Sequence, residues 1–358
     1  MPMLPERVDS VIGADTHRDT NEVEIAYPTG AVITTGQFSN DSAGYAATLA
    51  WINQHAPGPR RVLSIEGSRS YGIGLARAAT AAGLPVVEAE QPTGRSRRGK
   101  GKSDPLDAHR AVLYALQQDA DKLPTPRSDG DREGLRILLC ARDEMTTTST
   151  GQINRLKALL RAGDDTDRRY ARDTLTITRL SELAKRRQPR DATREQAIRH
   201  AEIRRLAMAV REATRALAAN YKQLASIVED LVPGLLDRCG VGPVSGAQAI
   251  VSFSHTGRCR SDAAYAKLAG TSPLEASSGK TKRHRLNRGG DRALNNAMYT
   301  IAKTRMRYDP DTMAYVQRRT AEGKSKKEIL RCVKRYITRQ LYRTLTAATA
   351  LNPAASST

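Results

Sequence analysis

Cysteine is scarce in this 358-residue chain, and the few cysteines that occur are scattered. No two of them form a Cys-x-x-Cys pair, and no histidine lies at zinc-ligand spacing from Cys140, Cys239, Cys259 or Cys332. The pattern therefore indicates neither a disulfide framework nor a zinc site. Long apolar runs are missing as well, since no run approaches the roughly 18 residues that a membrane-spanning helix needs.

The start of the chain lacks the pattern of a secretory signal. Residues 1–10 lead into a strand-like pattern at 8–15 and not into the apolar core of a signal peptide. We therefore expect a soluble, intracellular protein that contacts no membrane. We place it in the cytoplasm.

Acidic residues are few in the last third of the chain. The whole sequence has 58 Lys and Arg against 38 Asp and Glu, a net charge of +20. Residues 1–90 carry −4, residues 91–110 carry +4, residues 111–230 carry +5 and residues 231–358 carry +15. This distribution predicts a polyanionic partner that binds mainly to the last third. Arginine outnumbers lysine 44 to 14, which suits bidentate phosphate contacts but also follows from a G+C-rich genome.

The first 117 residues have the pattern of an α/β domain. The predicted strands are 8–15, a hairpin at 22–38, 60–67 and 84–90, and the predicted helices are 42–54, 71–82 and 103–117. The order is therefore β-ββ-α-β-α-β-α. Two of these strands end in an acid, Asp15 and Glu66, and open α/β sheets place their sites at the carboxyl ends of strands.

The remainder of the chain is predicted to be mostly helical. Apolar residues spaced three and four apart indicate a long amphipathic helix in 197–231, and 151–163 ends another. We expect these to pair, as packed helices or as a coiled coil, and to act as a spacer or a dimer arm. The Gly-rich, basic segment 271–294 predicts a loop or hairpin, and helices with basic faces are predicted at 292–307 and 325–347.

Four acids form the strongest candidate site. Asp15 and Glu66 end strands, while Asp104 and Asp107 open a helix three residues apart and therefore share one face. Mg²⁺ prefers carboxylate oxygens, and two ions about 4 Å apart clamp the attacking and leaving oxygens of a phosphodiester. Each acid alone is more often a helix cap or a solvated residue. The prediction of a metal site therefore rests on the joint pattern.

The segments that contain these acids resemble a known family. "VIGADTHRDTNEVEI", "LSIEGSRSYG" and "GKSDPLDA" are similar to the acid-bearing motifs of the DEDD insertion-sequence transposases, which include the Piv DNA invertase and the bridge-RNA-guided serine recombinases. In the second half, "CGVGPVSGAQAIVSF", "AKLAGTSPLEASSGK", "LNRGGDRALNNAMY" and "DPDTMAYVQRRTAEGK" resemble the carboxyl-terminal transposase domain in the same order. The resemblance spans roughly residues 8–345, and it implies a bacterial protein that is associated with the nucleoid.

This resemblance implies a fold class and a domain order. An α/β domain of the RuvC-like, RNase H type is expected at 8–125, and a helical, coiled-coil linker at 126–230. A mostly helical carboxyl-terminal transposase domain is expected at 231–348, followed by a disordered tail at 349–358.

The resemblance also implies a chemistry. Asp15, Glu66, Asp104 and Asp107 would bind Mg²⁺ or Mn²⁺, and Ser278 would attack a DNA phosphodiester to form a phosphoserine linkage, with Ser277 beside it as a rival. A structured bridge RNA would pair with both the element donor DNA and the target DNA. Homodimers would pair into a tetramer, with the serine of one protomer set on the acids of another or, alternatively, folded back onto its own.

Basic and imidazole side chains near these motifs are further candidates. Nucleic-acid contacts are predicted for Arg95, Arg97, Arg98, Lys100, Lys102, Lys280, Lys282, Arg283, Arg285 and Arg288. His284 is either a base or, more readily, a phosphate contact. His17 and His109 lie close in sequence to the acids and either position metal ligands or are structural.

Two other functions fit parts of the sequence. A RuvC-like, structure-specific endonuclease such as a junction resolvase would use metal-activated water and leave Ser278 a structural residue. A nucleic-acid-binding protein without catalysis would account for the charge, but it leaves the four acids unexplained.

Overall fold

The computed structural model divides into two compact units. It describes residues 2–89, 104–127, 129–188, 190–275, 284–285, 287 and 289–351, with the backbone alone for 104–106, 122, 284–285 and 351. Unit 1 comprises Met1–Glu133, Ser252–Asp291 and Arg335–Thr358, and unit 2 comprises Gly134–Val251 and Arg292–Lys334. Neither unit is one continuous piece of chain. The domain order expected from the sequence stays a prediction.

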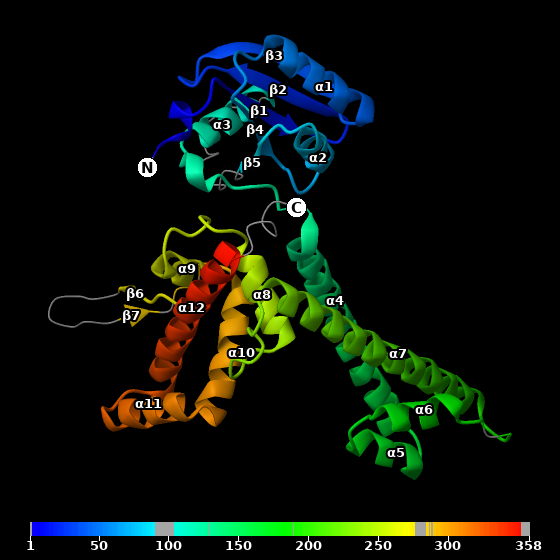
Figure 1. Ribbon diagram of the computed structural model, residues 1–358. Coiled ribbons are helices and arrows are strands. Elements are labelled where there is room, and N and C mark those ends of the chain that lie inside the picture. The colour runs from blue at the N-terminus through cyan, green and yellow to red at the C-terminus, as the bar shows by residue number, and fades with distance from the viewer. Residues whose placement is uncertain are drawn as a thin grey trace. The chain divides into compact units, whose positions relative to one another are not determined.

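Unit 1 contains a five-stranded mixed sheet (Figure 1). Its strands lie in the order β3-β2-β1-β4-β5, with bounds Val32–Ser39, Thr20–Ala26, Ser10–Thr16, Arg61–Glu66 and Val86–Ala89. β1, β2 and β3 are antiparallel neighbours, whereas β4 is parallel to β1 and β5 is parallel to β4. The hairpin predicted at 22–38 is confirmed, and Gly30 supplies the positive φ of 87° that its turn needs.

Helices cover both faces of this sheet. Asp41 caps α1 (Ser42–His55) by accepting a hydrogen bond from the Gly44 main-chain N at 2.8 Å. α1 and α2 (Ile73–Ala81) bury their apolar sides against one face of the sheet, with Ile12, Ala14, Leu63 and Ile65 in that core. α3 (Asp104–Leu116) packs on the opposite face, against Val11, Val62 and Val87. The strand residues alternate between these two cores, which is why the residues of β1, β2 and β4 are all buried except the half-buried Thr20, Glu22 and Arg61.

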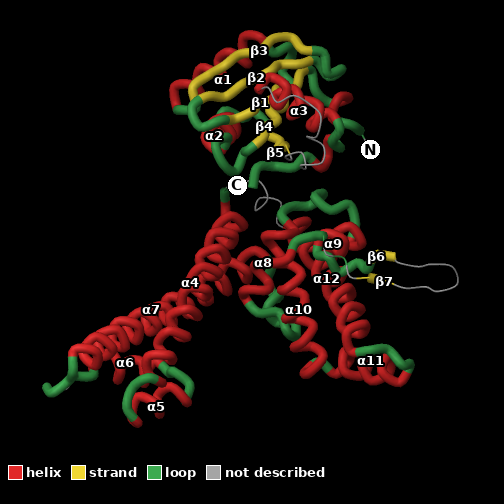
Figure 2. The backbone as a smooth tube through the Cα atoms, turned by 180° about the vertical axis from the view of Figure 1, so that it is seen from behind, coloured by secondary structure: helices red, strands yellow, loops and turns green. Residues whose placement is uncertain are grey.

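Two long helices dominate unit 2. α4 (Gly130–Arg161) and α7 (Arg194–Leu231) lie side by side in both backbone views (Figures 1 and 2). Arg142 of α4 donates to the Leu217 carbonyl at 3.0 Å, and Asn220 of α7 donates to the Leu138 carbonyl at 2.9 Å. Two short helices, α5 (Asp165–Arg172) and α6 (Ile177–Lys185), close the far end over a leucine-rich core. The expected pairing of long helices is confirmed.

The rest of the chain is mostly helical. It contains α8 (Pro243–Phe253), α9 (Asp262–Leu268), a two-stranded ladder of β6 (Leu274–Glu275) and β7 (His284–Arg285), α10 (Arg292–Tyr308), α11 (Pro310–Ala321) and α12 (Lys326–Leu351). In unit 1, Phe253, Tyr265 and Tyr342 form an aromatic cluster with ring centroids 5.7–6.1 Å apart. Among the described helices, none is both long and apolar enough to cross a membrane.

Candidate active site

Asp15 and Glu66 are neighbours in the centre of the sheet. They are register partners on the parallel strands β1 and β4. Register partners point to the same face of a sheet, and neighbouring strands are only about 4.8 Å apart. Both residues are buried, with 6% and 8% of their surface exposed. The fold therefore holds two adjacent carboxylates at the carboxyl ends of its two central strands, as the sequence predicted for each strand separately.

Gly13 shows which face these carboxylates occupy. Residues two apart on a strand share a face, so Gly13 and Asp15 point the same way. A Cβ on Gly13 would lie 2.2 Å from the main-chain oxygen of Ala108 and 2.7 Å from Cγ2 of Val112, both in α3. Asp15 and Glu66 are therefore on the face that α3 covers.

The direction of α3 brings its amino terminus toward the two acids. Val112 and Ala115 pack with Val11 at the start of β1, whereas Ala108 meets Gly13 two residues further along the strand. The first turn of α3 thus extends toward the Asp15 end of β1. That turn begins with Asp104 and Asp107, and a helix amino terminus favours nearby negative charge.

Asp107 is buried but already has a partner. The residue is 9% exposed, and its carboxylate accepts a hydrogen bond from Arg110 one turn later. The Asp104 side chain lies outside the described residues. Among the side chains that are described, no group of three His, Cys, Asp or Glu is placed to hold a metal ion. The paired carboxylates suit a hard divalent ion, and the four-acid site stays a proposal.

Further contacts fix the ends of the two central strands. His17 Nε2 lies 3.1 Å from Asp15 Oδ2, and the Thr16 hydroxyl donates to the Glu66 carbonyl at 2.9 Å. His17 therefore contacts a candidate metal ligand, as one of its two predicted roles requires. His109 does not do so among the described contacts, because its Nδ1 lies 2.7 Å from Glu24 Oε1.

Glu24 is a buried acid that the sequence analysis missed. It is 4% exposed, and it is the register partner of Gly13 on β2, so it shares the face that α3 covers. The signal in the sequence was its position between Val23 and Ile25, both of which belong to the opposite core. An acid that alternates with core residues in a central strand needs a partner, and His109 supplies it.

Replacing Gly13 by alanine tests the close approach of α3 to the acids. The added methyl group would collide with the α3 backbone, so we expect Gly13→Ala to push α3 away, with a loss of stability of roughly 1–3 kcal/mol. The DNA cleavage that the family resemblance implies should fall at least about tenfold. Cleavage assays and urea denaturation measure the two effects.

Gly134→Ala and Gly151→Ala are matched controls for this variant. Both glycines lie in α4, and a Cβ at either position meets nothing within 4 Å. Alanine should raise helix stability there by about 0.5–1 kcal/mol and leave cleavage unchanged. Wild-type cleavage by Gly13→Ala would contradict the proximity of α3 to the site.

The predicted nucleophile Ser278 and its rival Ser277 lie outside the described residues. The same is true of most of the predicted nucleic-acid contacts, namely Arg95, Arg97, Arg98, Lys100, Lys102, Lys280, Lys282, Arg283 and Arg288. Ser278 falls between β6 and β7, whose register pairs Leu274 with Arg285 and Glu275 with His284. The two chain segments that flank the expected loop are therefore paired as antiparallel strands. Only the backbone of His284 and Arg285 is described.

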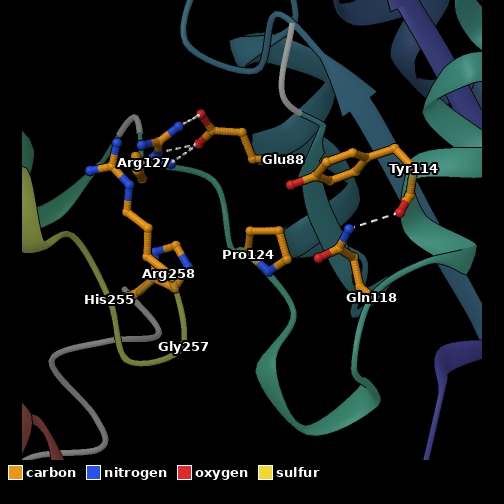
Figure 3. Close-up of a pocket in the computed structure, with 8 residues that line it drawn as sticks. All are labelled: Glu88, Tyr114, Gln118, Pro124, Arg127, His255, Gly257 and Arg258. Carbon is orange, nitrogen blue, oxygen red and sulfur yellow. Dashed lines mark hydrogen bonds and ion pairs between the residues drawn. The ribbon is translucent and has the colours of Figure 1, made fainter. Parts of the chain in front are cut away.

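A polar pocket of about 80 Å³ lies elsewhere in unit 1 (Figure 3). Glu88 at its wall accepts hydrogen bonds from the Arg127 main-chain N at 3.1 Å and from Arg127 Nε at 2.9 Å, and Arg69 Nε lies 3.3 Å away. Burial by itself would raise the pKa of Glu88, but the hydrogen bonds and charge of Arg127 outweigh it and hold that pKa below its usual value. Burial, with the charge of Arg127 adding to it, lowers the pKa of Arg132 to about 10.

His255 in the same pocket makes folding sensitive to acid. Burial, together with the charges of Arg127 and Arg258, lowers its pKa to about 4, from 6.5. The unfolded chain therefore binds a proton at higher pH than the folded chain does. Stability contributed by neutral His255 is full above pH 6.5 and falls as the pH drops toward 4, by on the order of 3 kcal/mol at most.

His255→Asn isolates this effect, because asparagine does not titrate. We expect the free energy of unfolding to fall more steeply in the wild type than in the variant between pH 6.5 and 4, as measured by urea denaturation at each pH. Parallel pH profiles for the two proteins would show that His255 is not held neutral by this pocket.

The mixed sheet and its buried acids define the class of protein when they are taken with the family comparisons. Residues 12–163 match the DEDD transposase model of the IS110 type, described as Transposase, and residues 235–317 match the model described as Transposase IS116/IS110/IS902 family. No curated protein matches the chain. The two matches occur in the order that the sequence motifs indicated, and they identify an enzyme that acts on DNA in transposition and recombination.

The chain is a DEDD-type transposase of the IS110 family. Its substrate is therefore DNA. DEDD-type transposases typically use divalent metal ions, which agrees with the oxygen-rich chemistry of Asp15 and Glu66.

Proposed function

We propose that this transposase cuts and joins element and target DNA through Ser278 and four Mg²⁺-binding acids. The observation that supports this most directly is the register pairing of buried Asp15 and Glu66 on the face reached by the first turn of α3. The sheet order β3-β2-β1-β4-β5, with three antiparallel strands and two parallel ones, supports the RuvC-like fold implied by the family.

The metal would be held by Asp15, Glu66, Asp104 and Asp107. When bound, Mg²⁺ neutralises charge that builds up on a phosphodiester undergoing substitution. The carboxylates fix its place, and His17 restrains Asp15 through the 3.1 Å contact. Without a cation, closely spaced carboxylates repel one another, so the acids would also make unliganded protein less stable.

Ser278 would perform the substitution itself. Its hydroxyl oxygen bonds to phosphorus while the bond between phosphorus and a deoxyribose oxygen breaks. The serine proton leaves, and the departing deoxyribose oxygen gains one. The phosphoserine linkage preserves the energy of the broken bond, and attack by a deoxyribose hydroxyl of another strand releases Ser278 and joins the DNA.

Basic residues would hold the nucleic acids during these steps. Lys280, Lys282, Arg283, Arg285 and Arg288 flank the serine, and the basic run from Arg95 to Lys102 precedes the acids of α3. Such side chains bind phosphates without reading sequence. The target sequence would therefore be selected by a structured bridge RNA, which pairs with donor and target DNA.

A shared active site between protomers follows from the need for several coordinated cuts. Recombination breaks two strands on each of two DNAs, which favours dimers paired into a tetramer. The long α4 and α7, of 32 and 38 residues, separate the acids from Ser278 in sequence and suit a dimer arm. The serine of one protomer would then act with the acids of its partner.

Complementation tests this arrangement together with the chemistry. Asp104→Ala and Ser278→Ala should each be inactive, and a mixture of the two should recover part of the covalent protein–DNA adduct, because some mixed assemblies combine intact acids with an intact serine. Denaturing gels that separate labelled adduct from free DNA measure this recovery.

The controls separate the two parts of the proposal. If the mixture forms mixed oligomers but no adduct, the shared site is wrong and each serine acts with its own acids. If the wild type cleaves DNA without any adduct, the serine step is wrong, and a resolvase-like cleavage by water explains the acids.

A further inference from the structure

The outer face of α10 has a stripe of aromatic and basic side chains. Every third or fourth residue along it is exposed, and these residues are Arg292, Asn296, Tyr299, Lys303 and Arg307. Its opposite side buries Leu294, Met298 and Ile301. The stripe thus belongs to an amphipathic helix whose polar side includes a tyrosine ring, 39% exposed, between cations.

Cations lie over tyrosine rings along α10 and α11. Lys303 Nζ is 5.5 Å from the centroid of the Tyr299 ring, and Arg307 Cζ is 5.2 Å from that of Tyr308. Arg318 Cζ and Arg319 Cζ are 5.5 Å and 5.8 Å from that of Tyr315. Each ring is therefore next to a group that binds phosphate, while 63% of the Tyr308 surface remains exposed.

α11 has no fully buried side chain, and only Thr312, Tyr315, Val316 and Arg319 are half-buried. Figures 1 and 2 show it turning sharply from the end of α10. All twelve of its residues are described, and none of them is buried. Pro310 begins the helix, and Asp309 caps it by accepting from the Thr312 main-chain N at 3.0 Å. A short helix gains little stability by itself, so a helix with no buried side chain is best explained by the surface it provides.

Charge indicates what covers this surface. Residues 292–334 contain 11 Lys and Arg against 4 Asp and Glu, a net charge of +7. Two copies of such a face repel each other, which disfavours self-association. A polyanion is the complementary partner. Tyrosine rings beside cations specify it further, because a base stacks on the ring while its phosphate meets the cation.

Only an unpaired base is free to stack in this way, since the faces of paired bases are covered by their neighbours in the duplex. We propose that the α10–α11 surface, formed by Tyr299, Tyr308 and Tyr315 with their cations, binds unpaired DNA. This inference rests on the proposed strand exchange, in which a cut strand leaves its first duplex before it joins the second. The surface would hold that strand between the two steps.

Direct binding measurements test the proposal on the full chain. The probes are a labelled oligo-dT single strand, an oligo-rU strand of equal length and a DNA duplex of equal length. Replacing all three tyrosines by alanine should weaken oligo-dT binding at least about tenfold, since each stacked base contributes a large part of the affinity. Replacing them by phenylalanine keeps the rings and should stay within about twofold of wild type.

Tyr221→Ala is the matched control. Tyr221 lies on α7, is 45% exposed, and has Arg142 Cζ 5.8 Å from its ring centroid. The Tyr221→Ala substitution removes a comparable ring that lies beside a comparable cation on another helix, so oligo-dT binding should not change. Duplex binding should be equal in all variants, which separates stacking from attraction to phosphate.

Several results would overturn the proposal. Equal loss of duplex and oligo-dT binding in the alanine variant would show that the surface binds phosphates only. A preference of the wild type for oligo-rU over oligo-dT of more than about tenfold would show that the surface binds RNA. A change in oligomeric state without a change in oligo-dT binding would make it a contact between protomers. If the triple alanine variant binds oligo-dT as the wild type does, and the wild type is active in strand transfer, the proposed role of this surface is wrong but the proposed function is not. If the wild type does not cleave DNA, the proposed function is wrong.

Discussion

Glu66→Gln and Asp15→Asn are each expected to lower DNA strand cleavage by at least about a thousandfold, because each removes a charged ligand from the proposed metal site. Both substitutions keep the size of the side chain, and both residues are buried register partners. Nucleic-acid binding should remain close to wild type, since the +15 charge of residues 231–358 is untouched. Cleavage of labelled DNA and a separate binding assay measure the two properties.

Metal binding gives these variants a second measurement that is independent of catalysis. Mg²⁺ that binds only the folded chain raises its melting temperature, and this rise should disappear in Glu66→Gln and Asp15→Asn. In the absence of Mg²⁺ the same variants should melt at or above the wild-type temperature, because one of two neighbouring charges is gone.

Glu24→Gln is the matched control for the loss of a buried carboxylate. Glu24 lies on the same face of the same sheet, is 4% exposed, and contacts His109. Its replacement should cost about 1 kcal/mol of stability through a weaker hydrogen bond, and it should retain most cleavage. Equal inactivation of Glu24→Gln and Glu66→Gln would show that the sheet, and not a specific metal site, had been damaged.

Ser278→Ala is expected to eliminate the covalent protein–DNA adduct completely, because no other protein hydroxyl in the proposal bonds to phosphorus. Binding of DNA and of Mg²⁺ should remain, since neither the acids nor the basic residues change. The adduct is measured on denaturing gels after incubation with labelled DNA and Mg²⁺.

Ser277→Ala provides the neighbouring control and should retain much of the adduct. The opposite pattern would assign the nucleophile to Ser277. Adduct formation by a protein that lacks both serines would exclude serine catalysis at this position altogether and would require another nucleophile.

The order of elements in the first 117 residues was predictable because local signals agree there with the final structure. Short apolar runs that end in an acid marked the strands at 8–15 and 60–67, alternating residues on both sides of Pro28-Thr29-Gly30 marked the hairpin, and Asp41 marked the start of α1. Two short helices of unit 2 and α11 were not predicted. α11 buries no side chain, so it has no apolar stripe for a periodicity argument to find.

Contacts between distant residues could not be predicted in the same way. The pairing of Glu24 with His109 joins residues 85 positions apart, and the Arg127–Glu88 contact joins residues 39 apart. Polar residues at such positions look like solvated or capping residues until packing places them against a partner. The lowered pKa of His255 likewise depends on burial and on the charge of Arg127, which comes from another part of unit 1.

The sequence by itself determined that Asp15 and Glu66 end strands and that Asp104 and Asp107 open a helix, because residue type and periodicity are local properties; their joint role in a metal site stays a proposal. The tertiary structure decided that Asp15 and Glu66 are register partners, and that α3 approaches their face closely enough to require glycine at position 13. It also placed tyrosine rings and cations together on α10 and α11. The physical reason is that strand register, the side of the sheet that a helix covers and contacts between helices depend on the packing of the folded chain.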